Sequence, residues 1–344
     1  SFGSTVSAAA AAIDLAVNAG DTVTFGGNVA DNAGANTDLN DLTVNAATLL
    51  VGAGVIMVEN DLNLGGTNNV VVDENGVYTS NNGNITFNAN GNLDAADGTE
   101  ALQLVTTLVG DVVLGTIGNA VPLFNLDVDA AGIGIINNNI TVAGAIDFAG
   151  SADVDLSGDS SITSTADGDI TFGTAVTDDI DGPFSLQITN TLGDVTLFQA
   201  GDNIPLDSLS VTTQNGTVNL DGTVDTTGHI DIDSSTALNI ALAVTSAGGD
   251  IDLTGATVTT TDVTGTITTA GDINIDATNG AATINADVDS TNSDVEISAS
   301  TDVTLNADVD GDNVVANAND GDVNVTAALN NGRGGYDFSA SGDI

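Results

Sequence analysis

A short pattern of apolar and polar positions recurs along the chain. A glycine and a polar residue precede an apolar–polar–apolar triplet, as in residues 83–87 and 168–172. Alternation with a period of two is typical of β-strands, and glycine followed by Asp or Asn is typical of turns. Further copies start at Gly110, Gly193, Gly228, Gly249, Gly271 and Gly321. The pattern therefore predicts many short strands separated by tight turns.

The spacing of these copies predicts how the strands are arranged. The starts at residues 249, 271, 293, 321 and 342 lie 22, 22, 28 and 21 residues apart. A repeat of this length indicates a solenoid in which each coil stacks on the previous one. We therefore expect an all-β fold, a right-handed parallel β-helix of roughly 12 to 16 coils without capping elements. Its apolar side chains should form internal ladders.

The short pattern is itself part of a longer repeat. Residues 83–148 and 168–232 share the same order of motifs, including Pro122-Leu123 in the first copy and Pro205-Leu206 in the second. Small insertions between otherwise similar copies indicate tandem duplication. We expect one continuous solenoid of four similar modules, at about residues 1–82, 83–167, 168–248 and 249–344.

The two ends of the sequence complement each other. Gly342, Asp343 and Ile344 form the first half of the short pattern, and Ser1, Phe2 and Gly3 match its second half as it stands in residues 168–173. These residues are therefore candidates for an end-to-end assembly interface, in a covalent array or a stack of separate copies. The alternative is an arbitrary boundary that happens to fall within a repeat.

The repeats resemble those of filamentous-haemagglutinin-type bacterial surface adhesins. The resemblance rests on the Gly-Asp-Ile/Val-x-Leu/Phe pattern and the Leu-x-Val stretches, and it covers nearly the whole chain. It implies a right-handed β-helix that is exported to the cell surface, often as a fibre. The Asn-Pro-Asn-Gly type motif of the family's secretion domain is missing from this sequence. The chain therefore resembles the shaft of such a protein.

The strongly negative net charge limits the kinds of molecule that the chain can bind. The sequence holds 48 acidic residues against one Arg (Arg333) and one His (His229), with a net charge of −47 and no Cys. A chain this acidic cannot neutralise phosphates, so nucleic acid and anionic membrane surfaces are excluded as partners. No apolar run is long enough to cross a membrane, so we expect no membrane insertion.

The Asp that follows the repeat glycine is the main candidate for ligand binding. We expect these residues to recur at one corner of the coil, where they would either satisfy backbone N–H groups or bind Ca²⁺, which prefers several oxygen ligands. The calcium-binding nonapeptide pattern Gly-Gly-x-Gly-x-Asp is absent. The candidate ligands are Asp111, Asp169, Asp194, Asp250, Asp272 and Asp322.

Two further functions fit the composition less well. A polysaccharide hydrolase needs paired carboxylates, and the densest acidic group consists of Asp178, Asp179 and Asp181. The chain has no Trp, however, on which a sugar ring could stack. Threonine-rich segments at residues 259–261 and 264–269 are similar to ice-binding faces, although Thr is also a common outward residue of strands.

These observations together predict a structural protein. We expect a secreted or cell-surface unit of an extracellular filament or fibrous adhesin, which stacks on copies of itself and needs no cofactor. The alternative is an adhesive shaft that binds a surface or a glycan. We do not expect an enzyme, because the chain offers no recognisable catalytic set.

Overall fold

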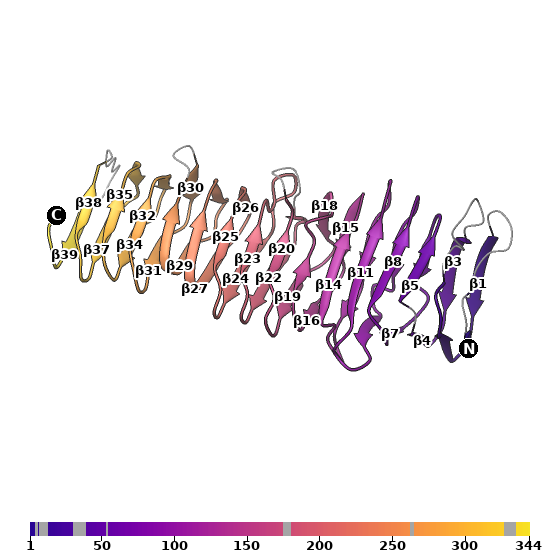
Figure 1. The fold of residues 1–344 in the computed structure, drawn as a ribbon. Helices are drawn as coiled ribbons and strands as arrows, with labels where there is room; N and C mark the ends of the chain where they lie inside the picture. Colours follow the sequence, from indigo (N-terminus) through magenta and orange to yellow (C-terminus); the bar gives the residue numbers. More distant parts are fainter. Residues whose placement is uncertain are drawn as a thin grey trace. The chain divides into compact units, whose positions relative to one another are not determined.

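The computed structural model describes residues 1–3, 6, 13–29, 39–52, 54–174, 180–261, 265–326 and 335–344. The chain forms two compact units, Ser1–Asp178 and Asp179–Ile344, which we treat separately. In each unit most strands are short, and they pair in parallel with the equivalent strand of the next turn (Figure 1). We call each column of stacked strands a file.

The first unit contains three files. File 1 holds β1 (Ile13–Asn18), β3 (Leu39–Asn45), β6 (Leu62–Leu64), β9 (Ile85–Phe87), β12 (Val112–Leu114), β15 (Ile133–Ile136) and β18 (Asp153–Leu156). File 2 holds β2 (Thr22–Phe25), β4 (Thr48–Val51), β7 (Asn69–Val72), β10 (Asn92–Ala95), β13 (Thr116–Ile117), β16 (Ile140–Val142) and β19 (Ser160–Ser164). File 3 holds β5 (Val55–Val58), β8 (Gly76–Ser80), β11 (Ala101–Thr106), β14 (Asn125–Asp129), β17 (Ile146–Asp147) and β20 (Ile170–Phe172).

The second unit begins with β21 (Ile180–Asp181) and builds three files of its own. File 4 holds β22 (Ser185–Asn190), β24 (Ser208–Thr213), the first halves of β27 (Ile230–Ile240) and β29 (Ile251–Thr260), β31 (Ile273–Ala277), β34 (Val295–Ala299), β37 (Val314–Ala318) and β39 (Tyr336–Ala340). File 5 holds β23 (Val195–Leu197), β25 (Val218–Leu220), the second halves of β27 and β29, β32 (Ala282–Ile284), β35 (Val303–Leu305) and β38 (Val323–Val325). File 6 holds β26 (Val224–Thr226), β28 (Val244–Ser246), β30 (Thr266–Thr269), β33 (Asp287–Ser290) and β36 (Val309–Asp310).

The core consists of apolar ladders inside the files. In file 4, Ile230, Ile251, Ile273 and Val295 occupy the same register position in successive turns, and all four are buried. The residue between each pair of inward positions faces outward, as the period of two requires. Stacking identical positions buries each side chain against one like itself, which removes apolar surface from water at every turn.

The structure confirms the predicted fold class. The chain is all-β, with parallel stacked strands that form a β-solenoid of about 14 turns, which lies within the expected range. Among the residues that the structure describes, we find no helix long and apolar enough to cross a membrane.

The Tyr78 hydroxyl is a buried polar atom of the first unit without a hydrogen-bond partner among the described residues. Tyr78 lies in file 3 between Ile56 and Leu104 and is completely buried, and its hydroxyl makes no hydrogen bond. Burial raises the pKa of this phenol above its ordinary value. A buried hydroxyl without a partner lowers stability, because it gave up its hydrogen bonds to water on folding.

We expect Tyr78→Phe to stabilise the protein. Removing the unpartnered hydroxyl while keeping the ring should raise the free energy of unfolding by about 1 kcal/mol. Urea denaturation followed by circular dichroism checks this, with Tyr336→Phe at a partly exposed position as the matched control. A lower urea midpoint for Tyr78→Phe would show that the hydroxyl has a partner after all.

Candidate functional site: the stacking corners

The corner before file 4 carries a ladder of carboxylates. Asp250 Oδ1 accepts the backbone N–H of Asp272 at 2.9 Å, and Asp272 Oδ1 accepts the N–H of Asp294 at 3.0 Å. Asp294 Oδ1 in turn accepts the N–H of Asn313 at 3.1 Å. Each carboxylate thus holds the corner of the following turn, at a position where the strands have not yet begun to pair.

A second ladder runs along the corner before file 5. Asp302 Oδ1 accepts the N–H of Asp322 at 2.9 Å, and Asp322 Oδ1 accepts the N–H of Asp343 at 2.7 Å. Asp194 lies earlier on the same corner, where its Oδ1 accepts the N–H of Thr217 at 2.8 Å. The expectation of a single Asp corner is therefore wrong: register divides the Gly-Asp pairs of this unit between two corners, although their local sequences look alike.

The first unit repeats the arrangement before file 1. Asp61 Oδ1 accepts the N–H of Asn84, Asn84 Oδ1 accepts that of Asp111, both at 2.8 Å, and Asp111 Oδ1 accepts that of Ile133 at 3.0 Å. Asn84 fills a ladder position with a neutral amide, so the position requires an acceptor oxygen and no charge. Asp169 lies at a different corner, before file 3, where its carbonyl accepts the N–H of Ile146 at 2.9 Å.

The repeat glycine makes room for the carboxylate of the preceding turn. A Cβ atom on Gly271 would lie 2.6 Å from Asp250 Oδ1, and one on Gly342 would lie 2.1 Å from Asp322 Oδ1. The same holds in the first unit, where a Cβ on Gly132 would lie 2.5 Å from Asp111 Oδ1. Glycine is therefore needed for space, because the carboxylate reaches the next backbone N–H across the glycine.

A buried hydroxyl completes many of these corners. Ser246 Oγ accepts the N–H of Gly249 at 2.9 Å and donates to the carbonyl of Gly228, one turn earlier. Thr269 makes the same pair of bonds, with the N–H of Gly271 at 3.0 Å and the carbonyl of Gly249. These hydroxyl residues are not among the functional residues predicted from the sequence. Their signal is a Ser or Thr two or three positions before a repeat glycine.

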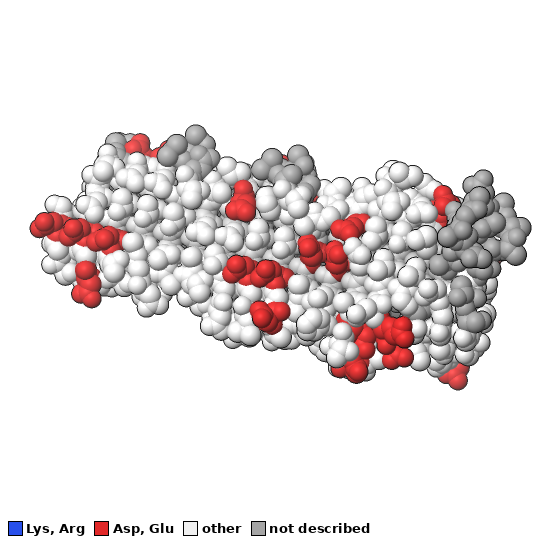
Figure 2. Space-filling view, viewed as in Figure 1, with Lys and Arg blue, Asp and Glu red and all other residues white. Residues whose placement is uncertain are grey.

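The calcium hypothesis for these carboxylates stays a prediction. The ladder bonds alone account for the placement of Asp111, Asp194, Asp250, Asp272 and Asp322. Two charges about 5 Å apart repel by only about 0.8 kcal/mol in water, so a ladder can stand without a cation at each step. Figure 2 shows acidic side chains in short rows separated by uncharged surface.

Three carboxylates, those of Asp127, Asp129 and Asp147, lie together on the outer face of file 3. Asp127 and Asp147 are register neighbours on β14 and β17, and Gln103 Nε2 donates to Asp127 Oδ2 and to Asp129 Oδ2, both at 3.0 Å. The pKa of Asp127 is raised to about 6, first by its partial burial and then by the charges of Asp129 and Asp147.

The two lone basic residues do not build a catalytic group among the described residues. His229 Nε2 lies 3.4 Å from Asp252 Oδ2, and both side chains are substantially exposed. The pKa of Asp231 is raised mainly by burial, while His229 counteracts this shift. Arg333 lies outside the described residues.

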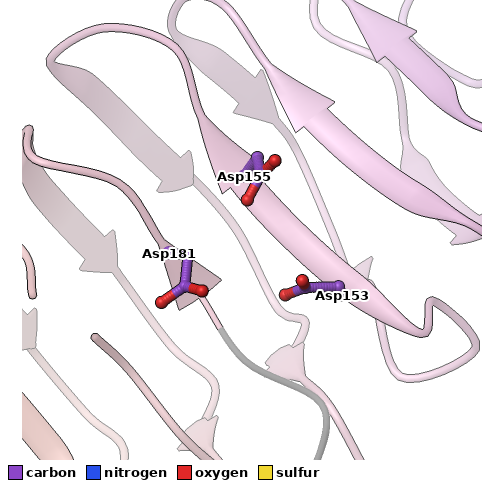
Figure 3. Close-up of side chains that lie close together, drawn as sticks. All are labelled: Asp153, Asp155 and Asp181. Atoms are coloured by element: carbon purple, nitrogen blue, oxygen red, sulfur yellow. The ribbon is translucent and has the colours of Figure 1, made fainter. Parts of the chain in front are cut away.

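The densest acidic cluster in the sequence does not appear as a described group. Asp178 and Asp179 lie outside the described residues, and Asp181 is buried in the second unit, where its Oδ1 accepts the N–H of Ile204 at 3.0 Å. Figure 3 draws Asp181 on β21, and it shows Asp153 and Asp155 projecting from one strand of the first unit, β18.

Asp94 plays the same part in the first unit as Asp181 does in the second. It is buried, and its Oδ1 accepts the N–H of Ala120 at 3.0 Å. Ala120 lies two positions before the Pro-Leu pair of its module, and Ile204 lies one position before the pair of the other. A buried carboxylate therefore fixes the loop in both copies, which accounts for the recurrence of this motif.

The threonine-rich segment does not present one continuous hydroxyl row. Thr259 faces outward, whereas Thr260 is buried and its hydroxyl accepts the N–H groups of Asn285 at 2.6 Å and Ala286 at 2.9 Å. In file 6 the outward Thr268 is followed in register by Asp289. Thr264 lies outside the described residues.

The residues assigned to the assembly interface lie in the first turn of the first unit and in the last turn of the second unit. In the first unit, the Phe2 N–H donates to the Thr24 carbonyl at 2.8 Å and its ring lies 5.4 Å from that of Phe25. In the second unit, the Gly342 N–H donates to the Gly321 carbonyl at 3.0 Å, and Ile344 is 73% exposed. Ser1 and Gly3 flank Phe2 and are exposed.

Comparison of the chain with protein-family models, curated proteins and solved structures gives no significant match.

Replacing one ladder carboxylate separates its hydrogen bond from its charge. We expect Asp272→Ala to lower the free energy of unfolding by about 1 kcal/mol, because the Asp294 N–H loses its acceptor. Asp272→Asn keeps an acceptor oxygen and should stay close to the original stability. Urea denaturation of both variants measures the difference. Equal destabilisation by Ala and Asn would assign the role of Asp272 to its charge.

The Asp127 group should make stability depend on pH. The folded state holds the Asp127 proton more tightly than the unfolded chain does, because its pKa is raised to about 6. Stability should therefore rise as the pH falls through about 6, and this gain should level off near the ordinary Asp pKa of about 4.

Asp127→Asn should flatten that dependence, and urea midpoints measured between neutral and mildly acidic pH check it. Asp111→Asn, which replaces one acceptor with another in the same unit, is the matched control. An unchanged slope in Asp127→Asn would contradict the assignment.

Proposed function

We propose that the chain is a structural unit of an extracellular filament or fibrous surface adhesin. Its turns would stack head to tail, either as consecutive stretches of one long chain or as separate copies. The observation that carries the proposal is the corner ladder, in which a turn accepts hydrogen bonds from the following turn and donates them to the preceding one. Such a pattern can continue through any further turn of the same sequence type.

The first turn of the first unit and the last turn of the second unit offer complementary groups for this contact. Asp343 repeats the donor role of Asp322, and its carboxylate is the next acceptor that the ladder would use. Phe2 already pairs with Phe25 as a solenoid residue does, and Phe148 and Phe172 stack at 5.0 Å within the first unit. We therefore assign Ser1, Phe2 and Gly3 to one face of the contact, and Gly342, Asp343 and Ile344 to the other.

The charge of the chain supports stacking along one direction only. A net charge of −47 on a chain with one Arg and no Lys opposes lateral association, because outward faces repel one another. Hydrogen-bonded turns can still add at the ends, where apolar ladders and backbone groups dominate. The proposal needs no cofactor and no catalytic residue, and it places the protein in a secreted or cell-surface location, as the adhesin resemblance implies.

End-to-end assembly can be seen directly. We expect the purified chain at neutral pH and moderate salt to form filaments one solenoid wide in negative-stain electron microscopy, with sedimentation that increases with concentration. Asp343→Ala should shorten the filaments because the next turn loses an acceptor, while Asp343→Asn should preserve them.

Discrete single-chain particles at every concentration would contradict assembly from separate copies and leave only stacking within one longer chain. If such particles instead bound a glycan array, the alternative of an adhesive shaft would be favoured.

A further inference from the structure

Five Asn–Gly pairs lie among the described residues, and the asparagine of each is exposed. They begin at Asn75, Asn82, Asn90, Asn215 and Asn279. In such a pair the glycine nitrogen can attack the side-chain Cγ, because no Cβ hinders its approach. The reaction requires that this nitrogen and the side-chain amide are both free to move. Exposure does not distinguish the five pairs. Which of them can react therefore depends on the hydrogen bonds that hold the glycine nitrogen and the asparagine side chain.

In the pair at Asn82, hydrogen bonds hold both the side chain that would be attacked and the nitrogen that would attack it. The Asn82 amide donates to Glu59 Oε1, and the Gly83 N–H donates to Ser80 Oγ at 3.0 Å. Attack would break both bonds. The side chain is therefore fixed in place and the nucleophilic nitrogen is engaged.

The other two pairs of the first unit are each held by one bond. The Gly91 N–H donates to the Asn88 carbonyl at 2.9 Å, which engages the nitrogen that would attack Asn90. Asn75 Oδ1 accepts the N–H of Ala101 at 2.8 Å, which fixes the side chain that would be attacked.

The two pairs of the second unit differ from these three. Among the described residues, neither the side-chain amide of Asn215 nor that of Asn279 makes a hydrogen bond, and the same holds for the N–H groups of Gly216 and Gly280. The Thr213 hydroxyl, which could have engaged the Gly216 N–H, donates to the Gly216 carbonyl at 2.7 Å instead. Among the described residues, therefore, no hydrogen bond holds the attacking nitrogen or the attacked side-chain amide in either pair.

We propose that Asn215 and Asn279 are the sites at which the folded protein converts asparagine to isoaspartate. The glycine nitrogen loses its proton to solvent and bonds to Cγ, and the Cγ–N bond breaks as the side-chain nitrogen takes a proton from solvent and leaves as ammonia. The resulting five-membered succinimide is then opened by water, which adds to either carbonyl and yields isoaspartate or aspartate. No oxidant, metal or enzyme is required.

The conversion would disturb hydrogen bonds that hold one turn on the next. The Gly216 carbonyl accepts from Ser234 Oγ at 3.0 Å, and the Gly280 carbonyl accepts from the Thr301 N–H at 3.1 Å, both in the following turn. Isoaspartate inserts a methylene into the backbone just before these carbonyls. Each event also adds a negative charge to a chain that already carries −47.

Peptide mapping of the aged protein tests the assignment. The full chain is incubated folded in mildly alkaline buffer, and isoaspartate is quantified at each pair by mass spectrometry after proteolysis. We expect Asn215 and Asn279 to convert at least about tenfold faster than Asn75, Asn82 and Asn90, since freeing one hydrogen bond changes a barrier by roughly that factor. In urea the five rates should converge.

The five Asn–Gly pairs of one sample serve as controls for one another. Equal rates at all five pairs in the folded chain would overturn the proposal. So would the absence of isoaspartate at Asn215 and Asn279 over a period in which the urea-treated chain reacts. Asn215→Gln should remove the signal at that position and leave Asn279 unchanged, which confirms the assignment of the peptides.

Discussion

A parallel β-solenoid has to satisfy its backbone at the corners as well as in its strands. Within a strand, each N–H finds a carbonyl one turn away through regular pairing. At a corner the chain changes direction and the regular acceptor is missing, yet the N–H of the first residue still points along the stack. An unsatisfied donor there would weaken every turn, so the fold depends on how this group is supplied with an acceptor. Here the acceptor is a side-chain oxygen of the previous turn.

That single requirement explains much of the composition. Asp and Asn place an oxygen at the right distance from the backbone, whereas Glu is longer and is rare in this chain. Glycine precedes many of these residues because the acceptor of the preceding turn occupies the space of its Cβ, as Gly271 and Asp250 illustrate. Buried hydroxyls such as Ser246 hold the adjoining carbonyl and N–H. The strong negative charge is thus in part a by-product of acceptor chemistry.

The sequence predicted the strands and their parallel stacking well, because a period of two within strands and a period near 22 between coils are both visible in one dimension. The sequence alone could not show which corner of the coil each Gly-Asp pair occupies. Gly271-Asp272 and Gly321-Asp322 read alike, yet register places them before different files. The reason for the glycine was also hidden, because the atom that excludes a Cβ belongs to a residue about 20 positions earlier. The sequence grouped the buried Asp181 with Asp178 and Asp179 as candidate carboxylates, since nothing local marks the loop N–H that Asp181 binds.

Hydrogen exchange measured residue by residue tests the ladder most directly. The N–H groups of Asp272, Asp294 and Asn313 lie at exposed residues outside the strands, and each donates to the carboxylate of the preceding turn. If the ladder holds the turns together, these amides exchange as slowly as the N–H groups of the neighbouring strands. Exchange at the rate of an open surface loop would show that the carboxylates do not hold the corners, and would contradict the account.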